Sequence, residues 1–446
     1  MKTRLINIWD HMVGSYWFVP SAIIFLSLIA AFLFPWLDQR YADQLDVASP
    51  WMTMSPDSAR TILSTISGVM TTVISLVFSL TMLTLSIATS QFGPRLLRSF
   101  LNNRSTQVVL GAFVATAIYA LIVLSMIRGT DSMTVVPRFS VYAAIVAAVV
   151  NLLYLIHFIN DISELIQVPN VVLRVARDLD ASIRRLYPVE KEEQSGAAPD
   201  RCDALPDKSA VLCSRQEGYL QGVDLEAIAE EARNADVVIR LCVHPGQFVA
   251  EGSGLADVCG PCDDADSLED TINQWTVTGT RRTPRQDVEC ALLELVELAV
   301  RALSAGINDP FTAINCIDRL GASLGRIAAC AIPESEFCDE EGVVRVVMPV
   351  VTFSDLLESA FNQIRQHGSG NTAVLIRVVE ALGEVARQCT RPSDGEAVLR
   401  HVTMIEREGE ESIHEPNDRE DLRRRADRIR ELLRPLVEEA GEKAEK

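Results

Sequence analysis

A row of hydroxylated and small side chains recurs along one uncharged segment of the chain, residues 61–94. Their spacing places them on one face of a helix, as in the seam of a left-handed helix pair. The members are Thr65, Gly68, Thr72, Ser75, Ser79, Ser86 and Thr89. In one interpretation the small side chains only let helices approach closely and pack. In a second, the row from several subunits surrounds a narrow polar path for an ion or small solute, and in a third the hydroxyls bond only to their own backbone.

The helix that carries this row is one of four predicted membrane spans. Asp, Glu, Lys and Arg are missing over a bilayer-spanning length from residues 17–36, 61–94, 105–127 and 139–160. A hydrocarbon core roughly 30 Å thick needs about 20 helical residues. Because these runs are continuously apolar rather than alternating, they predict helices and exclude membrane-spanning strands. The second stretch is longer than a bilayer requires, so we expect it to tilt strongly or to project beyond the membrane.

The interiors of these spans contain no ionisable side chain of the kind that proton-coupled transporters use as a relay. His157 lies near the end of the fourth span and shares a helix face with Asp161 and Glu164. We interpret this face as an ion-pair surface at the membrane interface. A metal-binding or pH-sensing role for His157 stays an alternative.

The charged residues are segregated between the two halves of the chain. Of 446 residues with a formal net charge of −19, residues 1–190 hold 13 Lys and Arg against 11 Asp and Glu, and residues 191–446 hold 28 against 49. Such an acidic half argues against a nucleic-acid binder, which needs clustered cations against phosphate. The expected partners are therefore the lipid bilayer, further copies of the chain and a small ion or solute, with no nucleic acid.

Basic residues and cysteines both bear on the orientation in the membrane. The distribution of Lys and Arg near the span ends favours both termini on the cytosolic side of a bacterial cytoplasmic (inner) membrane. All ten cysteines follow the last span, between residues 202 and 389. A reducing cytosol keeps such thiols free, whereas a periplasmic domain would be expected to pair them. We therefore expect a multi-pass inner-membrane protein with cytosolic N- and C-termini.

The expected fold class is an α-helical polytopic membrane protein: four transmembrane helices, then a mainly α cytosolic region with a small α/β or β-hairpin module. The expected domains are 1–165 for the four-helix transmembrane domain, 166–206 for a juxtamembrane helix and linker, 207–280 for the small α/β module and 281–446 for a helical cytosolic domain. In the module, residues 219–223 and 237–243 predict strands that flank a helix capped by Asp224. Residues 343–351 predict a later strand, and Ser354 is the expected cap of the helix after it.

A tight corner between two predicted helices, residues 306–313, carries the other candidate site. Asp309 is the expected N-cap and Pro310 the first residue of the second helix, so capping chemistry explains most of the corner. The alternative is a buried polar cluster that binds a ligand. Its members would be Arg301, Asn308, Asp309, Asn315 and Asp318.

Enzymatic chemistry finds little support in the sequence. The run Cys259-Gly-Pro-Cys262 has the dithiol spacing of a thioredoxin active site, but the residues after it predict helices rather than the rest of that fold. The absence of lysine between Lys208 and Lys443 excludes a P-loop or Schiff-base lysine there. Hydrolase, Walker and metalloprotease motifs are missing as well. We therefore expect no enzyme, no cofactor and no metal site, and leave open whether Cys259 and Cys262 are redox active.

Three elements of the sequence resemble those of a known family. They are Arg282-Thr283-x-x-Gln286-Asp287, the run Arg301-Ala-Leu-Ser-Ala-Gly-Ile-Asn-Asp-Pro-Phe-Thr-Ala313, and Ser90-Gln-Phe-Gly-Pro-Arg95. Together they are similar, over most of the chain, to a family of predicted bacterial membrane proteins that carry a domain of unknown function. Ala305 stands where that family leads us to expect proline before Gly306. The resemblance implies a polytopic bacterial membrane protein and supplies no activity or site residues.

The sequence therefore leads us to expect a homo-oligomeric channel or pore-like protein that serves ion transport. Its second helix would line the path with Ser and Thr, and a cytosolic domain would regulate it. The alternative is a non-conducting membrane scaffold or sensor in which the hydroxyl seam only packs helices. Whether the second helix faces a central axis separates the two.

Overall fold

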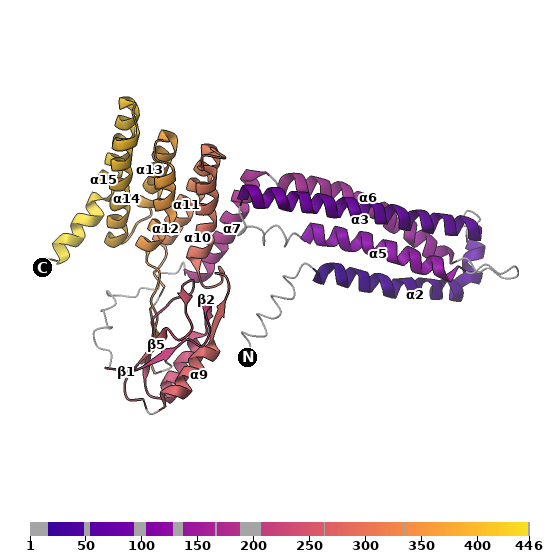
Figure 1. Cartoon of the computed structure of the whole chain (residues 1–446), viewed down its shortest axis with the longest axis horizontal. Coiled ribbons are helices and arrows are strands. Elements are labelled where there is room, and N and C mark those ends of the chain that lie inside the picture. The colour runs from indigo at the N-terminus through magenta and orange to yellow at the C-terminus, as the bar shows by residue number, and fades with distance from the viewer. Residues whose placement is uncertain are drawn as a thin grey trace. The chain divides into compact units, whose positions relative to one another are not determined.

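The computed structural model describes residues 17–48, 54–92, 104–127, 137–165, 167–187, 207–262, 264–333, 335–339 and 341–444. The chain divides into two compact units, Met1–Asn170 and Val171–Lys446. Here the first is named the membrane unit and the second the C-terminal unit (Figure 1).

Long helices dominate the membrane unit (Figure 1). They are α2 (Phe18–Ala48), α3 (Pro56–Phe92), α5 (Arg104–Met126) and α6 (Arg138–Leu165). Each contains a stretch that is long and apolar enough to cross a membrane, and in α3 this stretch covers 35 residues. The four predicted spans and the α-helical fold class are therefore confirmed. The stretch in α3 exceeds the roughly 20 residues that a bilayer core requires, as its uncharged length predicts.

Helix α5 lies at the centre of the membrane unit, in contact with α2, α3 and α6. Half of its span is buried, against 17–22% in the other three helices. Gly111 lets α2 approach closely, because a Cβ at this position would lie 2.9 Å from the Cα of Pro20. Phe113 is fully buried and packs in one cluster with Met70 of α3 and Phe158 of α6. Large apolar side chains on the outer helices remain exposed, as expected where lipid is the solvent.

A buried carboxylate joins the second half of α2 to the start of α6. Asp38 is 5% exposed, and it accepts hydrogen bonds from the backbone N–H groups of Phe139 at 2.8 Å and Ser140 at 3.0 Å. The hydroxyl of Ser140 donates to it as well, at 2.7 Å. Asp38 thus satisfies N–H groups that the start of a helix leaves without partners, the role that an N-cap normally has within one segment.

Helix α7 (Val168–Leu186) leads into the C-terminal unit and its β-rich module. The strands are β1 (Lys208–Cys213), β2 (Gly218–Val223), β3 (Val238–Leu241), β4 (Phe248–Val249), β5 (Gly254–Cys259), β6 (Thr276–Gly279), β7 (Glu336–Cys338) and β8 (Val344–Val347). They form a five-stranded sheet in the order β1-β5-β3-β8-β7 and a three-stranded sheet in the order β4-β2-β6. Helices α8 (Leu225–Asn234) and α9 (Ala265–Trp275) complete the module.

The larger sheet draws on residues well beyond the expected 207–280 range. Strand β8 pairs in parallel with β3, with Ile239 opposite Val346, and β7 pairs with the other edge of β8. The fully buried side chains of Leu212, Ile239, Leu255 and Val346 belong to one core cluster. Strands that are about a hundred residues apart in the chain therefore share a single core.

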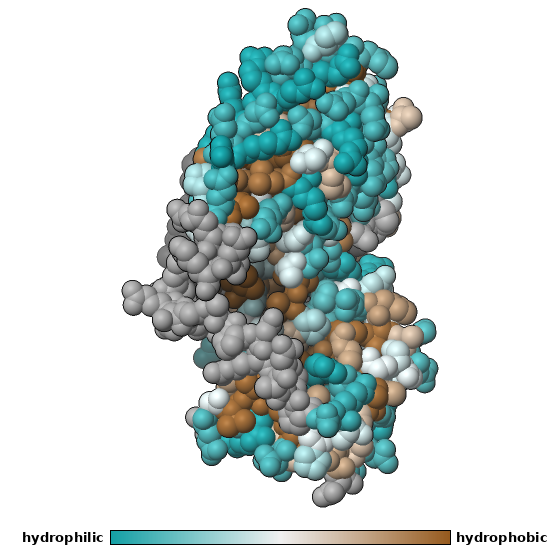
Figure 2. All heavy atoms as spheres, turned by 90° about the vertical axis from the view of Figure 1, so that its left-hand side faces the viewer, coloured by the Kyte–Doolittle hydropathy of each residue, from teal (hydrophilic) through white to brown (hydrophobic). Residues whose placement is uncertain are grey.

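The remaining helices form three hairpins that stack side by side (Figure 1). They are α10 (Val288–Ala302), α11 (Pro310–Ala329), α12 (Phe353–His367), α13 (Thr372–Ala386), α14 (Pro392–Ser412) and α15 (Pro416–Ala444). Helices α11, α13 and α15 pack as one row, and α10, α12 and α14 as the other. Stacked hairpins of this kind occur in α-solenoids, which use rows of helices as extended binding surfaces. Hydrophilic side chains cover most of the visible surface of this array in Figure 2.

Candidate functional site

The predicted hydroxyl row of α3 lies on the outside of the membrane unit. All seven of its members are exposed: Thr65, Gly68, Thr72, Ser75, Ser79, Ser86 and Thr89. The buried side of α3 carries Leu63, Met70 and Val77 instead. Since successive helical residues are about 100° apart, the row lies opposite this buried side. The row therefore faces either lipid or another protein chain.

Most hydroxyls of the row are already bonded within their own helix. Thr65 donates to the carbonyl of Thr61 at 2.7 Å, and Thr72 donates to that of Gly68 at 3.1 Å. Ser75 and Thr89 donate to carbonyls four residues before them, at 3.2 Å and 2.8 Å. Among the described residues, Ser79 and Ser86 make no such bond. These two hydroxyls are the ones left to interact with water or a partner.

One polar side chain inside the membrane unit was missed by the sequence analysis. Asn151 of α6 is 3% exposed and donates to the Thr116 hydroxyl of α5 at 2.9 Å and to the Ala112 carbonyl at 3.3 Å. Its amide also lies 3.6 Å from the sulfur of Met70 in α3. Asn151 thus links three helices. An Asn in the middle of an apolar span could have predicted this link between helices.

The expected ion-pair face at the end of α6 is present in part. The Nε2 atom of His157 lies 3.6 Å from a carboxylate oxygen of Asp161. Glu164 instead accepts a hydrogen bond from Asn160 at 3.0 Å. The His157 side chain is 62% exposed, so this pair contributes little to stability.

Two carboxylates of the predicted polar cluster around residues 306–313 have separate partners. Asp309 caps α11, accepting hydrogen bonds from the backbone N–H of Thr312 at 3.2 Å and from its hydroxyl at 2.5 Å. Asp318 lies nine residues further along, roughly 13 Å at 1.5 Å per helical residue, and pairs with Arg377 of α13. Asn308 and Asn315 are exposed, and Arg301 is half-buried. The capping interpretation of Asp309 and Pro310 is confirmed.

The Arg282-to-Asp287 element fastens the β-rich module to the helical array. Arg282 donates to both carboxylate oxygens of Asp287, at 2.7 Å and 2.9 Å, and to Glu289 at 2.6 Å. Gln286 bonds to both the N–H and the carbonyl of Val223 in β2, at 2.8 Å and 3.1 Å. Gly246 has a φ of +104°, and a Cβ there would lie 2.3 Å from an Asp287 oxygen. The element is therefore a structural clamp between two parts of the unit.

The charges of this clamp are fixed by their mutual bonds. Burial alone would raise the pKa of Glu289, but hydrogen bonds from Ser359 and Arg282 outweigh it and lower that pKa. Burial alone would lower the pKa of Arg282, and its bonds to Asp287 and Glu289 raise it instead. Groups held in one charge state in this way suit a structural ion pair rather than proton transfer.

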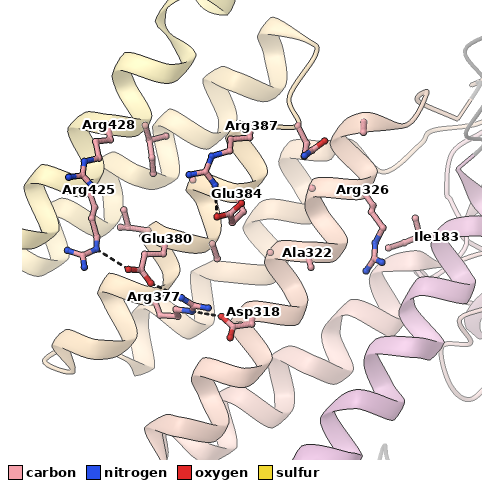
Figure 3. A pocket seen from close by; sticks show the side chains of 18 of the residues that line it. Ile183, Asp318, Ala322, Arg326, Arg377, Glu380, Glu384, Arg387, Arg425 and Arg428 are labelled. Carbon is pink, nitrogen blue, oxygen red and sulfur yellow. Dashed lines mark hydrogen bonds and ion pairs between the residues drawn. The ribbon is translucent and has the colours of Figure 1, made fainter.

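The C-terminal unit also contains a groove of about 1170 Å³ over the row of α11, α13 and α15. Figure 3 shows Arg425 and Arg428 of α15 on one bank and Ile183 of α7 on the other, with Ala322 of α11 between them. Seven arginines line the groove: Arg184, Arg326, Arg377, Arg387, Arg424, Arg425 and Arg428. Its carboxylates are Asp318, Glu380, Glu384 and Asp421.

Each carboxylate in the groove is bonded to arginine. Glu380 accepts hydrogen bonds from Arg377 at 2.8 Å and from Arg425 at 3.1 Å. These bonds outweigh the effect of burial, so the pKa of Glu380 is lowered and the carboxylate stays charged. Asp421 pairs with both Arg425 and Arg424, the latter at 3.2 Å. The sequence analysis missed this site, because its arginines come from helices more than 200 residues apart.

The described part of the chain contains no group of three or more His, Cys, Asp or Glu side chains that could hold a metal ion. Cys259 is buried in β5, Cys262 follows that strand, and neither is in a disulfide. Whether Cys259 and Cys262 are redox active therefore stays an open question.

Four apolar helices of spanning length, followed by two sheets and stacked helical hairpins, define a mainly α-helical membrane protein with a large C-terminal unit. The chain matches a family described as predicted membrane protein (DUF2254) over residues 13–384, and it belongs to that family. It is 29% identical over 429 residues to uncharacterized proteins of Mycobacterium bovis and Mycobacterium tuberculosis, which covers 94% of this chain and 81% of each relative. No solved structure matches the chain. The resemblance to a family of predicted membrane proteins is thereby confirmed.

Proposed function

We propose that the chain forms a homo-oligomeric channel or pore-like protein in the bacterial cytoplasmic membrane, with the hydroxyl row of α3 turned toward a common axis. In this proposal both termini and the C-terminal unit lie in the cytosol, where the C-terminal unit regulates the path. The observation that carries the proposal concerns Ser79 and Ser86: both lie on the side of α3 opposite to its buried side, and their hydroxyls make no hydrogen bond among the described residues.

Lipid is a poor environment for this face of α3. The Ser79 and Ser86 hydroxyls make no bond among the described residues, and burying an unpaired hydroxyl in hydrocarbon is unfavourable. A ring of identical helices around a closed symmetry axis would remove the whole row from lipid. It would also leave the hydroxyl oxygens as ligands along a narrow path.

The scaffold or sensor alternative rests on a different observation. Thr65, Thr72 and Ser75 donate to their own helix, so their hydroxyls need neither water nor a partner. In this alternative the row is a close-packing surface between copies, and no path exists between them.

Conductance of a Ser79→Leu variant separates the two functions. Purified full-length protein in a planar bilayer should conduct, and a leucine from every copy should close the narrow path and abolish the current. The cross-linked oligomer of the Ser79→Leu variant should have the same size as that of the wild type. Ser125 is an exposed serine on α5, outside the row, so Ser125→Leu is the matched control and should conduct like the wild type. Wild-type protein without conductance, or a Ser79→Leu variant that dissociates, would support the scaffold instead.

The proposed cytosolic location has its own test. Cys242 and Cys338 are exposed, unpaired thiols of the C-terminal unit. A membrane-impermeant maleimide should label them in inside-out vesicles and leave them unlabelled in intact spheroplasts. The Cys242→Ser/Cys338→Ser variant is the control and should lose that signal. Labelling in intact spheroplasts would place the C-terminal unit outside the cytosol.

A further inference from the structure

The groove over α11, α13 and α15 differs in charge from the chain around it. Residues 191–446 contain 28 Lys and Arg against 49 Asp and Glu, yet the groove takes six arginines and four carboxylates from this range, and Arg184 adds a seventh arginine. A concave surface with a surplus of one charge concentrates ligands of the opposite charge. The groove therefore suits an anion, although the chain as a whole is acidic.

Two of its arginines have no partner within the described residues. Arg184 of α7 and Arg428 of α15 are exposed, and neither makes an ion pair or hydrogen bond with any residue of the described ranges. Arg424 lies one helical turn before Arg428. Its carboxylate partner, Asp421, is shared with Arg425. Cationic side chains on both banks can therefore bind a ligand without breaking an internal pair of Arg184 or Arg428.

The floor of the groove consists mostly of small side chains. Ala322 and Ala329 are exposed on α11, each about one turn from Gly325, and Gly383 lies on α13. Gly321 packs directly on α13, since a Cβ there would lie 2.9 Å from that of Ala381. Small side chains leave room for the uncharged part of a ligand. The volume of about 1170 Å³ is slightly above the range of roughly 300–1,000 Å³ that is usual for small-molecule sites.

We propose that this groove binds a phosphate-bearing ligand, whose phosphates are held by Arg184, Arg424 and Arg428 above the small-residue floor. The planar fork of a guanidinium matches phosphate oxygens in bidentate geometry. The phosphate comes either from a soluble organic polyphosphate or from the headgroup of an anionic lipid. The proposal extends the regulatory role given to the C-terminal unit under the proposed function. Binding itself requires no conduction.

Phosphate fits the groove better than further carboxylates do. The two arginines without partners carry two positive charges, and a single carboxylate brings only one negative charge to them. A phosphate monoester carries about −1.5 to −2 charges at pH 7. That charge matches the two arginines without partners, Arg184 and Arg428, on opposite banks.

Binding is measured on purified full-length protein in nanodiscs of zwitterionic lipid. The probes are ATP, pyrophosphate and soluble short-chain phosphatidylglycerol, titrated by calorimetry at about 0.15 M salt. Arg428→Ala should weaken binding about tenfold, as expected for one charge-assisted hydrogen bond. Ala322→Phe should weaken it similarly by filling the floor while keeping every charge. Arg407 is exposed on α14 and does not line the groove, so Arg407→Ala is the matched control and should bind like the wild type.

The outcomes separate the source of the phosphate from the proposal itself. Saturable binding of ATP or pyrophosphate with this pattern of variants supports a soluble ligand, and the same pattern with phosphatidylglycerol alone supports a lipid headgroup. The proposal is overturned if no probe binds, or if Arg407→Ala weakens binding as much as Arg428→Ala. A chain that binds a probe but never conducts would overturn the channel and leave the groove as a ligand site.

Discussion

Polar side chains in the membrane unit bond mainly to uncharged groups, whereas charged side chains in the C-terminal unit are joined into networks. Thr65 and Thr72 of α3 donate to their own helix, and Asn151 bonds to side chains and backbone of neighbouring helices. In the C-terminal unit, Arg282 bridges two carboxylates and Arg377 bridges two others. The solvent explains this difference, because lipid offers no water to an unpaired group, while water screens and solvates shared charges.

An exposed polar side chain has a different significance in each unit. A hydroxyl that is bonded to its own backbone tolerates lipid, so exposure of the α3 row does not by itself require a partner; only Ser79 and Ser86 argue for one. An arginine without a partner at the edge of a groove is easily tolerated in water, so Arg428 contributes little to stability and remains available for a ligand. It follows that single substitutions should disturb the C-terminal networks far more than the uncharged polar bonds of the membrane unit.

The largest effect is expected at the Arg282 clamp. Arg282→Ala leaves Asp287, whose side chain is 2% exposed, and Glu289 without their cation. Loss of one partner of a buried ion pair destabilises a protein by about 3–5 kcal/mol. Hydrogen exchange of full-length protein in detergent should therefore speed up in β2 and α10. Arg407→Ala removes an exposed arginine and should shift stability by less than about 0.5 kcal/mol. Equal effects of Arg282→Ala and Arg407→Ala would contradict the stabilising role assigned to the charged network.

A second, pH-dependent effect is expected between α12 and α14. His401 is 1% exposed, and burial lowers its pKa to about 4, with a further lowering from the positive charge of Arg400 that Glu358 opposes. The His401 imidazole takes up a proton near pH 6.5 in the unfolded chain but only near pH 4 in the folded chain. The free energy of unfolding therefore has its full value above pH 6.5 and falls as the pH drops toward 4. A shift of this size corresponds to at most roughly 3 kcal/mol.

Thermal unfolding of the full-length protein between pH 7 and 4 measures this loss. His401→Leu removes the buried imidazole and should flatten the dependence over that interval. His367 is exposed on α12, and His367→Leu is the control that should keep the wild-type slope. A His401→Leu variant with an unchanged slope would assign the acid sensitivity to other groups.

Features set by neighbouring residues in the chain were predictable from the sequence. The charge-free runs predict the four spans, and the capping roles of Asp224 and Asp309 are confirmed. Ser354 was the wrong choice of cap for α12. Thr352 caps this helix, because Asp355 is then the third helical residue and returns the bond to the Thr352 N–H in a capping box. Thr352 and Ser354 both carry a hydroxyl, and only the complete capping-box pattern identifies Thr352 as the cap.

Features that join distant segments were not predictable. Strand β8 pairs with β3 across about a hundred residues, and a short apolar run does not reveal its partner strand. Arg184 of α7 and Arg428 of α15 line one groove only in the folded chain. In the sequence, Arg428 belongs to a mixed-charge helix, a pattern typical of a solvated face. Its place beside a groove depends on tertiary packing alone.

The smallest effect is expected inside the membrane unit, at Asn151. Asn151→Leu keeps a similar volume and removes the bond to Thr116, and such bonds between membrane helices contribute about 0.6 kcal/mol on average. Unfolding of the protein in bicelles should therefore shift only slightly. Asn160 lies on the exposed side of the same helix and bonds only to Glu164 among the described residues, so Asn160→Leu is the control and should leave stability unchanged. A loss at Asn151 as large as that of Arg282→Ala would show that uncharged polar bonds between membrane helices stabilise this protein as strongly as charged networks in water do.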